Sequence, residues 1–498
     1  MSELSADVVV IGGGNAALCA ALAARDEGAD VLLLERAPES ERGGNSYYTG
    51  GIIRFPYQDT ADLIASFPEL EGGESEIIDA DPYTEAHFFE DMARTTDYRS
   101  DPELLEALVR ESRGTMEWMH GKGVRLLWSL GRHAHKVDGR FRFFGGAIVT
   151  YWGGGAGLID TLFATAEAEG VRIRYGARAI ELLGKEVGHV TGVRVQMDGE
   201  EKLVDIAARS VVIASGGFQA NTAWRTQYLG PGWDLARVRG TAYNTGDGIQ
   251  MATDFGAKPF GHWSGCHAVA WDANAPLTGE RSMGDEFSRH SYPMGIVVNK
   301  DSKRFLDEGY DFHTHTYARY GQEILKQPGM VAYQLFDDKT EQFLRSDYRG
   351  RHVTRAKADT IEELAEKLEL DPAELRATVD EFNASIDDSI PFNPNVKDSR
   401  ATSGITPRKS NWAQALDTPP YLGFAVTTGI TFTFGGLRVD PNGRVLDDAE
   451  RHISGLFAGG ELVGGIFYHN YPTGTGLMTG SVFGRAAGRS AALAAAQA

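Results

Sequence analysis

Apolar residues near the N-terminus are grouped in a pattern that predicts a strand, a helix and a second strand. Val8 to Ile11 form a β-branched run, and the stretch after the glycines at positions 12–14 is apolar and rich in alanine. A further apolar run ends at Glu35. β-Branched runs favour strands, and alanine-rich stretches favour helices. This order predicts a βαβ unit, the building block of a parallel sheet.

The next part of the chain continues this alternation of helical and extended patterns. Two stretches show helical spacing, and three short apolar runs are typical of strands. The helices are expected at Leu104 to His120 and Gly157 to Glu169, and the strands at Val171 to Tyr175, Val190 to Val195 and Ser210 to Ala214.

The pattern changes beyond Asp247, where the chain becomes aromatic and irregular. Helices are expected there at Thr360 to Leu368 and at Pro372 to Phe382, the second opened by Asp371 as its N-cap. Glycine-rich sequence returns near residue 431, and the alanine-rich tail at 486–498 is expected to be helical. We therefore predict an α/β protein with a discontinuous Rossmann-type nucleotide-binding domain. Its segments would be residues 1–258 and 426–498, and residues 259–425 would form an inserted α+β capping domain that binds substrate.

Composition limits the possible functions. The formal charge of −20 argues against nucleic acid or an anionic membrane surface as a partner. Only Cys19 and Cys266 are present, too few for an iron–sulfur cluster, and no metal site is expected. The sequence has no basic signal region and no apolar run of about 18 residues. We expect a cytoplasmic protein that does not insert directly into a membrane.

The first glycine turn carries the clearest chemical signal. Gly12, Gly14 and Ala17 fill the three small positions of G-x-G-x-x-G/A, and Glu35 follows roughly 20 residues later. In such a turn, small residues let a pyrophosphate approach the start of the helix, and the acid accepts hydrogen bonds from a ribose. These residues predict a dinucleotide cofactor.

Four sequence blocks extend this interpretation over nearly the whole chain. They are GGGNAALCAALAA at 12–24, RGGNS at 42–46, ASGGF at 214–218 with TGDG at 245–248, and FAGGELVGG followed by TGLMTGSVFGRAAG near the C-terminus. With these blocks the chain resembles the FAD-dependent family of fumarate reductase and succinate dehydrogenase flavoproteins, 3-ketosteroid dehydrogenases and tricarballylate dehydrogenase. The segments YPMGIVVNKDSKRFLDEG, QPGMVAYQLFD and YHNYPTGTGLMTGSVFGRAAG are most similar to the tricarballylate dehydrogenase branch.

The resemblance implies FAD as the cofactor, held by residues of these blocks. The helix that begins near Thr475 would direct its N-terminus at the flavin and stabilise negative charge on it. The residues expected to bind FAD are Gly12, Gly14, Asn15, Ala16, Glu35, Arg36, Gly43, Gly44, Asn45, Ser46, Gly50, Gly51, Ala177, Ala214, Ser215, Gly216, Asp247, Gly460, Glu461, Gly476 and Leu477.

The substrate side departs from the fumarate reductases. Tyr471 stands where such an enzyme has a carboxylate-binding arginine, and Phe432 replaces a histidine, whereas His267 matches another substrate-site histidine. The run NYP at 470–472 is similar to the 3-ketosteroid dehydrogenases, in which this tyrosine binds a substrate carbonyl. We therefore expect Tyr471 and His267 to polarise the substrate. The alternative is that Tyr471 only packs beside the flavin.

The family places its proton-exchanging residue four or five positions beyond the acid matched by Glu308. Those positions are Phe312, which has no exchangeable proton, and His313, which titrates near neutral pH. His313 is the predicted base or acid, with His315 and Tyr317 as neighbouring candidates. A purely structural histidine is the alternative.

A cluster of basic residues precedes the glycine run at 153–155. It is a candidate for binding a substrate carboxylate, and an exposed basic loop is the alternative. Arg281, Arg289 and His290 are weaker candidates for the same role. The residues of the cluster are Arg132, His133, His135, Lys136, Arg140 and Arg142.

Together these features predict an FAD-dependent dehydrogenase that forms a C=C bond next to a carboxylate or carbonyl of a small organic substrate. Alternatives are a C=C reductase, an enzyme like the 3-ketosteroid dehydrogenases, and a non-catalytic flavin-binding subunit. An external electron acceptor or a partner redox protein would reoxidise the flavin. Substrate identity, reaction direction and covalent attachment of FAD stay open at this point.

Overall fold

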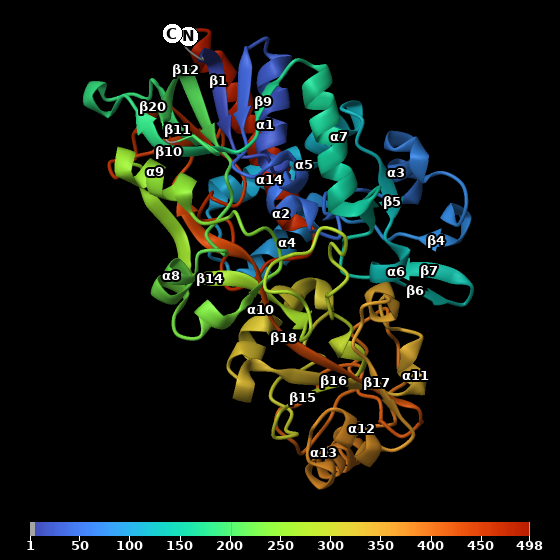
Figure 1. Cartoon of the computed structure of the whole chain (residues 1–498). Helices are drawn as coiled ribbons and strands as arrows, with labels where there is room; N and C mark the ends of the chain where they lie inside the picture. The colour runs from blue at the N-terminus through green and yellow to red at the C-terminus, as the bar shows by residue number, and fades with distance from the viewer. Residues whose placement is uncertain (1–4, 201, 498) are drawn as a thin grey trace.

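The computed structural model describes residues 5–200 and 202–497, which form a larger and a smaller lobe. Both ends of the described chain belong to the larger lobe, since β1 (Ser5–Ile11) and α14 (Thr475–Ala495) lie there together (Figure 1). The smaller lobe is drawn in yellow and orange and comes from the middle of the chain.

A parallel sheet forms the centre of the larger lobe. β1 pairs in parallel with β2 on one side and with β12 on the other, and the C-terminal strand β20 joins β12. The sheet is therefore built from both ends of the chain, as predicted for a discontinuous Rossmann-type fold. β10 and β11 extend it as an antiparallel pair. The remaining strands are β2 (Val31–Leu34), β9 (Arg172–Arg174), β10 (Ala177–Leu183), β11 (Gly192–Met197), β12 (Leu203–Ile213), β19 (Arg444–Leu446) and β20 (His452–Ala458).

Apolar helices cover this sheet. α1 (Asn15–Asp26) packs directly on α14, and its alanine-rich residues from Asn15 to Ala24 are buried. The predicted tail helix is part of α14, which packs on β1, β12 and β20; residue 498 lies outside the described residues. The other helices of this lobe are α2 (Gly44–Tyr47), α3 (Thr60–Ser66), α4 (Glu85–Thr95), α5 (Pro102–Gly121), α6 (Leu130–His133), α7 (Gly154–Ala168), α8 (Thr222–Trp224) and α9 (Asp247–Phe255).

A second, mixed sheet links the lobes. Its longest strand, β18 (Tyr421–Leu437), pairs with β14 (Pro259–Asp272), β13, β16 and β17. β14 and β18 run from the larger lobe into the smaller one (Figure 1), so the two lobes share one sheet. Its other strands are β13 (Arg237–Val238), β15 (Ile296–Asn299), β16 (Ala332–Phe336) and β17 (Ala356–Ala358).

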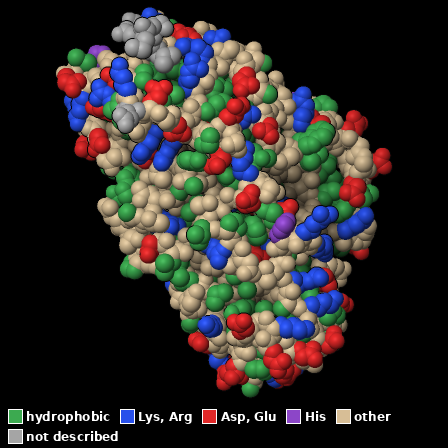
Figure 2. Space-filling view, in the orientation of Figure 1, with side chains coloured by type: hydrophobic (Ala, Val, Ile, Leu, Met, Phe, Trp, Pro, Cys, Tyr) green, Lys and Arg blue, Asp and Glu red, His purple; other side chains and the backbone are tan. Residues whose placement is uncertain are grey.

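Helices of the smaller lobe pack against this second sheet. α10 lies against β14 and β18, and α12 and α13 form a pair at the far end. Asp371 caps α13 as predicted, accepting from the backbone N–H groups of Ala373 and Glu374. Acidic side chains gather over this far end (Figure 2). The helices are α10 (His313–Leu325), α11 (Asp338–Glu341), α12 (Ile361–Lys367) and α13 (Pro372–Ala384).

Two small sheets complete the larger lobe, and one of them carries part of the basic cluster. The strands are β3 (Ile52–Ile53), β5 (Leu126–Trp128) and β8 (Val149–Tyr151) in the first, and β4 (Ile78–Asp79), β6 (Ala134–Val137) and β7 (Arg140–Phe143) in the second. None of the described helices combines the length and apolar character needed to cross a membrane.

The α/β fold class with a mixed sheet is confirmed. The domain limits at 258 and 425 stay a prediction, although the second limit falls inside the continuous strand β18.

Candidate active site

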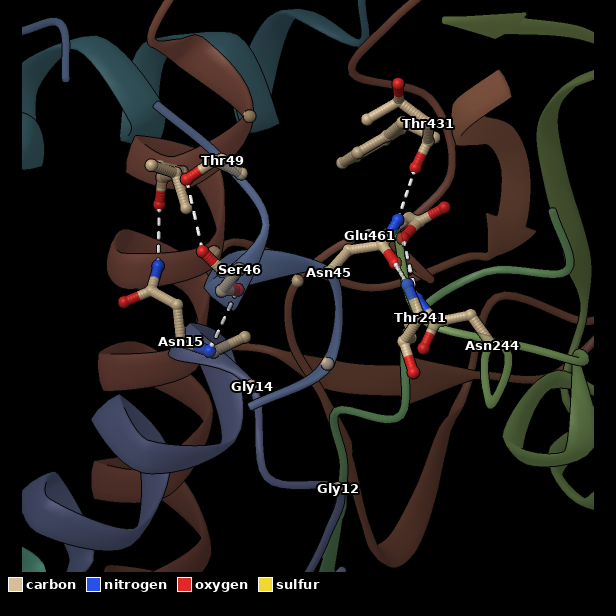
Figure 3. Close-up of a pocket in the computed structure, with 18 of the residues that line it drawn as sticks. Gly12, Gly14, Asn15, Asn45, Ser46, Thr49, Thr241, Asn244, Thr431 and Glu461 are labelled. Carbon is tan, nitrogen blue, oxygen red and sulfur yellow. Dashed lines mark hydrogen bonds between the residues drawn. The ribbon is translucent and has the colours of Figure 1, made fainter. Parts of the chain in front are cut away.

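A large cavity lies where the two lobes meet, and residues of both lobes line it. Figure 3 shows its wall in the larger lobe, from Gly12 to Glu461. Its walls include the first turns of α1 and α14, the ends of β1, β2 and β12, and residues of β14 and β18. The carboxyl ends of the parallel strands are the usual ligand-binding edge of such a sheet.

The turn between β1 and α1 leaves the start of α1 accessible. Gly12 has φ of +117°, which an L side chain rarely adopts, and a Cβ there would lie 2.4 Å from the carbonyl oxygen of Ala214. Gly14 begins the helix without any side-chain cap. Helix N-termini with free N–H groups attract anions, so this turn fits a phosphate group.

A second helix start lies beside the first. α14 also begins at a glycine, Gly474, without a side-chain cap. Asn15 joins the two first turns, because its amide nitrogen Nδ2 donates to the carbonyl of Leu477 at 2.9 Å and to Ser481 Oγ at 3.0 Å. Two positive helix ends therefore face one cavity.

Two buried carboxyl groups lie along the same cavity. Glu35 Oε1 accepts from the Ala37 backbone N–H at 2.7 Å, and Glu461 Oε1 accepts from that of Thr433 at 2.8 Å. Burial raises the pKa of each to about 7, because it disfavours the charged form. Such carboxyl groups can accept hydrogen bonds from the hydroxyls of a sugar or sugar alcohol.

The RGGNS turn is tied into the cavity. The Asn45 side chain donates to the carbonyl of Thr431 at 2.6 Å and accepts from the backbone N–H of Thr241 at 2.9 Å. Ser46 Oγ accepts from the backbone N–H of Asn15 at 3.1 Å. Figure 3 shows Asn45 pointing toward Thr431 and Thr241, and Ser46 pointing toward Asn15. These contacts hold the segment against the cavity and distinguish it from a free surface turn.

The structure brings together nearly all residues expected to bind FAD. Gly43 is the exception: it does not line the cavity and packs on Ile159, where a Cβ would come within 2.7 Å. The individual role of each residue stays a prediction. The residues that line the cavity are Gly12, Gly14, Asn15, Ala16, Glu35, Arg36, Gly44, Asn45, Ser46, Gly50, Gly51, Ala177, Ala214, Ser215, Gly216, Asp247, Gly460, Glu461, Gly476 and Leu477.

Tyr471 and His267 form a pair at the α14 end of the cavity. Their phenol oxygen and Nδ1 atoms are 2.7 Å apart, and both side chains are buried. The aromatic rings of Phe432 and Phe467 also pack on Tyr471, so this residue has both a packing and a polar contact. Burial raises the pKa of Tyr471 well above its usual value and keeps the phenol protonated.

His313 lies behind the cavity wall. It lines a smaller adjoining cavity, and its ring stacks on His133 with centroids 5.3 Å apart and on His290 at 6.2 Å. His290 and Tyr317 line the large cavity itself. His315 points elsewhere, into an ion-pair cluster with Asp91 and Asp311.

The basic cluster divides in two. Arg132 and His133 line the large cavity, and His135 lines the smaller one. Lys136, Arg140 and Arg142 lie on the β6–β7 hairpin, where Arg140 pairs with Asp79 at 2.7 Å. An exposed basic surface therefore describes Lys136, Arg140 and Arg142, whereas carboxylate binding by the three residues at the cavities stays a prediction. Of the weaker candidates, Arg289 is buried against Asp272 at 2.8 Å and Arg281 donates to the Arg42 carbonyl at 2.7 Å.

Several cavity residues were not found from the sequence, and Arg239, Asp285 and Arg345 are charged ones among them that form ion pairs. Arg239 donates to Asp285 Oδ1 at 2.9 and 2.5 Å, and Arg345 lines the cavity from the smaller lobe. They come from separate loops, Arg239 before the irregular region and Arg345 within it, and belong to no motif. The sequence pointed to this part of the cavity through the basic cluster, because its member Arg132 also pairs with Asp285.

The described residues contain no group of three or more His, Cys, Asp or Glu side chains arranged to hold a metal ion. Cys19 and Cys266 are buried, and neither forms a disulfide bond within the described residues. The cavity instead presents two uncapped helix starts, two buried carboxyl groups and a buried Ser215 hydroxyl without a partner among the described residues. These groups fit the phosphates and hydroxyls of a dinucleotide.

Comparison with known proteins defines the class. Residues 7–477 match the FAD-binding domain family, so the chain belongs to this family. It is 28% identical over 487 residues to a probable fumarate reductase of Shewanella frigidimarina, covering 97% of this chain and 74% of that protein.

Two solved structures show the same fold. One is the open form of a flavocytochrome c3 fumarate reductase, with a TM-score of 0.73, 26% identity and coverage of 99% of this chain and 79% of the other. The second is the 3-ketosteroid Δ4-(5α)-dehydrogenase of Rhodococcus jostii, with a TM-score of 0.68, 26% identity and coverage of 98% and 97%. The protein is an FAD-dependent oxidoreductase that acts on CH–CH groups.

Proposed function

We propose that this protein is an FAD-dependent dehydrogenase that forms a C=C bond next to a carboxylate or carbonyl of a small organic substrate, as tricarballylate dehydrogenase does. The observation that carries this proposal is the hydrogen-bonded pair of Tyr471 and His267 at the α14 end of the flavin cavity. FAD bound in this cavity would supply a hydride acceptor.

The pair can hold one activating oxygen of the substrate. If His267 donates from Nδ1 to the phenol oxygen, the Tyr471 hydroxyl proton is free to bind a substrate carbonyl or carboxyl oxygen. The burial that keeps the phenol protonated makes it a permanent donor. A hydrogen bond to that oxygen acidifies the neighbouring C–H bond.

A proton must leave the substrate carbon, and the imidazoles beside the pair are suited to take it. His290 lines the cavity and its Nδ1 atom has no partner among the described residues. His313 stacks behind it, with Nε2 also unpartnered within the described chain. We propose that His290 meets the substrate and that His313, the residue expected from the sequence, exchanges the proton behind it.

The experiment is an anaerobic titration of the flavin absorbance with tricarballylate, succinate and a saturated 3-ketosteroid. We expect bleaching by a carboxylic acid. Tyr471→Phe should bleach at least tenfold more slowly with its flavin content unchanged, because only the hydroxyl is removed. An unchanged rate would leave Tyr471 as a packing residue, and His313→Ala tests the proton route in the same assay.

The reverse reaction is the second candidate, because relatives of this chain include fumarate and urocanate reductases. Reoxidation of the reduced enzyme by an unsaturated acid, without bleaching by any saturated one, would establish a reductase. In either direction we propose an external electron acceptor or a partner redox protein.

A further inference from the structure

At the Tyr471 end of the cavity, the buried positive charges outnumber the buried negative charges. Among the described residues, Arg132, Arg239 and Arg345 form ion pairs with two buried carboxylates, Asp285 and Asp347. The carboxylate of Glu286 also acts on Arg132, but it is exposed to solvent and forms no ion pair with these arginines within the described chain. Asp285 is saturated, since it accepts two hydrogen bonds from Arg239, one from Arg132 and one from Ser288. One positive charge is therefore left over in a buried place.

The neighbouring imidazoles do not change this balance. Burial lowers the pKa of His133, His267 and His290 well below the usual value, so these rings are neutral near pH 7. They can act as hydrogen-bond donors without adding charge.

Arg345 is the least satisfied of the three arginines. Its side chain is buried, with 7% exposed, and Nε lies 3.2 Å from Asp347 Oδ2 without hydrogen-bond geometry. Arg132 shares the same Asp347 carboxylate, with Nε 3.3 Å from Oδ1. Burial lowers the pKa of Arg345, with Asp347 opposing this effect, as expected for a guanidinium with incomplete compensation. An unpaired buried charge is costly, and a bound anion would remove that cost.

The helix starts that suit the cofactor phosphates belong to α1 and α14 in the larger lobe. Arg345 comes from the smaller lobe and lines the cavity together with His133, His290 and Tyr317. His290 and Tyr317 are in edge-to-face contact, with centroids 5.2 Å apart, and Tyr317 similarly contacts His267 at 4.7 Å. The guanidinium and the Tyr471–His267 pair thus belong to one continuous wall.

We propose that Arg345, flanked by His133 and His290, is a carboxylate-binding subsite, and that the substrate carries a carboxylate there in addition to the group held by Tyr471 and His267. This rests on the proposed function and narrows it: the substrate is an organic acid with at least two polar ends, not a simple ketone. A guanidinium binds carboxylates through two parallel hydrogen bonds, which also orients the acid.

The test measures binding separately from turnover. Malonate is the probe, because its single methylene group cannot form a C=C bond; its neutral analogue malonamide is the control ligand. Binding to the oxidised FAD-loaded protein is followed by the flavin difference spectrum and by calorimetry. Arg345→Met should weaken malonate binding about 10- to 150-fold, the range for a hydrogen bond to a charged group. Flavin content should not change.

Two further variants separate charge from folding. Arg345→Lys keeps the charge without the planar fork, and should lie between the wild type and Arg345→Met. Arg349→Met is the matched control: Arg349 is exposed, lies one turn further on and donates to the Glu341 carbonyl at 3.0 Å, so its loss should leave malonate binding unchanged.

The inference is overturned if Arg345→Met binds malonate as tightly as the wild type, if malonamide binds equally well, or if the wild type binds neither malonate nor tricarballylate. The proposed function fails in a different way. Carboxylates would then bind in an Arg345-dependent manner, but no acid would bleach the flavin or reoxidise its reduced form.

Discussion

At the scale of single residues, the carboxyl group of Glu35 has opposite effects on cofactor binding and on the stability of the flavin-free fold. A Cβ on Gly13 would come within 2.2 Å of its Oε2 atom, so the side chain is held tightly against the nucleotide turn. Burial raises its pKa from 4.5 to about 7, which means that the folded state binds this proton more tightly than the unfolded state. The contribution of this carboxyl group to the stability of the flavin-free protein is therefore fully present below pH 4.5 and is lost as pH rises through 7.

We predict that Glu35→Gln stabilises the flavin-free protein at pH 8 by on the order of 3 kcal/mol and has little effect at pH 4.5, because the amide cannot ionise. The same change should weaken FAD binding at least tenfold, since an amide is a poorer acceptor for ribose hydroxyls than a carboxylate. Urea unfolding and FAD titration at the two pH values measure these effects.

Glu461 has the same raised pKa, so some pH dependence should remain in the Glu35 variant. Glu39→Gln is the control. The Glu39 side chain is 70% exposed, so this change should alter neither the stability of the flavin-free protein nor its affinity for FAD. Equal destabilisation of the wild type and the Glu35 variant between pH 4.5 and 8 would contradict the prediction.

At the scale of elements, the contact between α1 and α14 places two helix starts at the cavity. This contact is so close that a Cβ on Gly488 would lie 2.0 Å from the carbonyl oxygen of Ala20, and one on Gly484 would lie 2.3 Å from that of Ala16. Neither backbone atom can move without moving its helix. The separation of the two helix starts is therefore set by glycines about three and four turns along α14.

We predict that Gly488→Ala destabilises the protein by about 1–3 kcal/mol, the usual cost of overpacking, and weakens FAD binding by displacing α14. Gly114→Ala is the matched control, because Gly114 is exposed within α5 and a Cβ there would meet nothing within 4 Å. That change should stabilise by roughly 0.5–1 kcal/mol through the higher helix propensity of alanine. Thermal unfolding with and without FAD distinguishes the two variants. Equal changes in stability for Gly488→Ala and Gly114→Ala would show that α1 and α14 are not tightly packed at Gly488.

Elements with a local sequence signal were predictable, and so was the gathering of their glycine-turn residues around one cavity. The βαβ unit, α5, α7 and the Asp371-capped α13 follow from apolar spacing and capping residues that lie close together in the sequence. Arg239, Asp285 and Arg345 could not be found in this way, because each lies in a loop and acquires its partner only when distant segments fold together. His313 shows the same limit, since its position in the chain did not reveal that other imidazoles separate it from the cavity.

At the scale of the whole molecule, the two lobes have largely separate apolar cores. The core of the larger lobe includes β1, α1 and α14, whereas Ile296, Leu364 and Phe382 belong to a distinct cluster in the smaller lobe. Between the lobes lie mainly the shared strands β14 and β18, the cavity, and buried ion pairs such as Arg132–Asp285. Much of the surface between the lobes is thus the cofactor and substrate site itself.

FAD should therefore act as part of the connection between the lobes. We predict that the flavin-free protein unfolds in two calorimetric transitions, with the smaller lobe and the larger lobe separable, and that the FAD-loaded protein unfolds in one. Binding to the folded state alone adds about 1.4 kcal/mol for every tenfold excess of FAD over its dissociation constant, so the merged transition should also move upward with FAD concentration. Differential scanning calorimetry at several FAD concentrations measures both effects. A single transition in the flavin-free protein, coincident by fluorescence and by circular dichroism, would show that β14 and β18 alone couple the lobes.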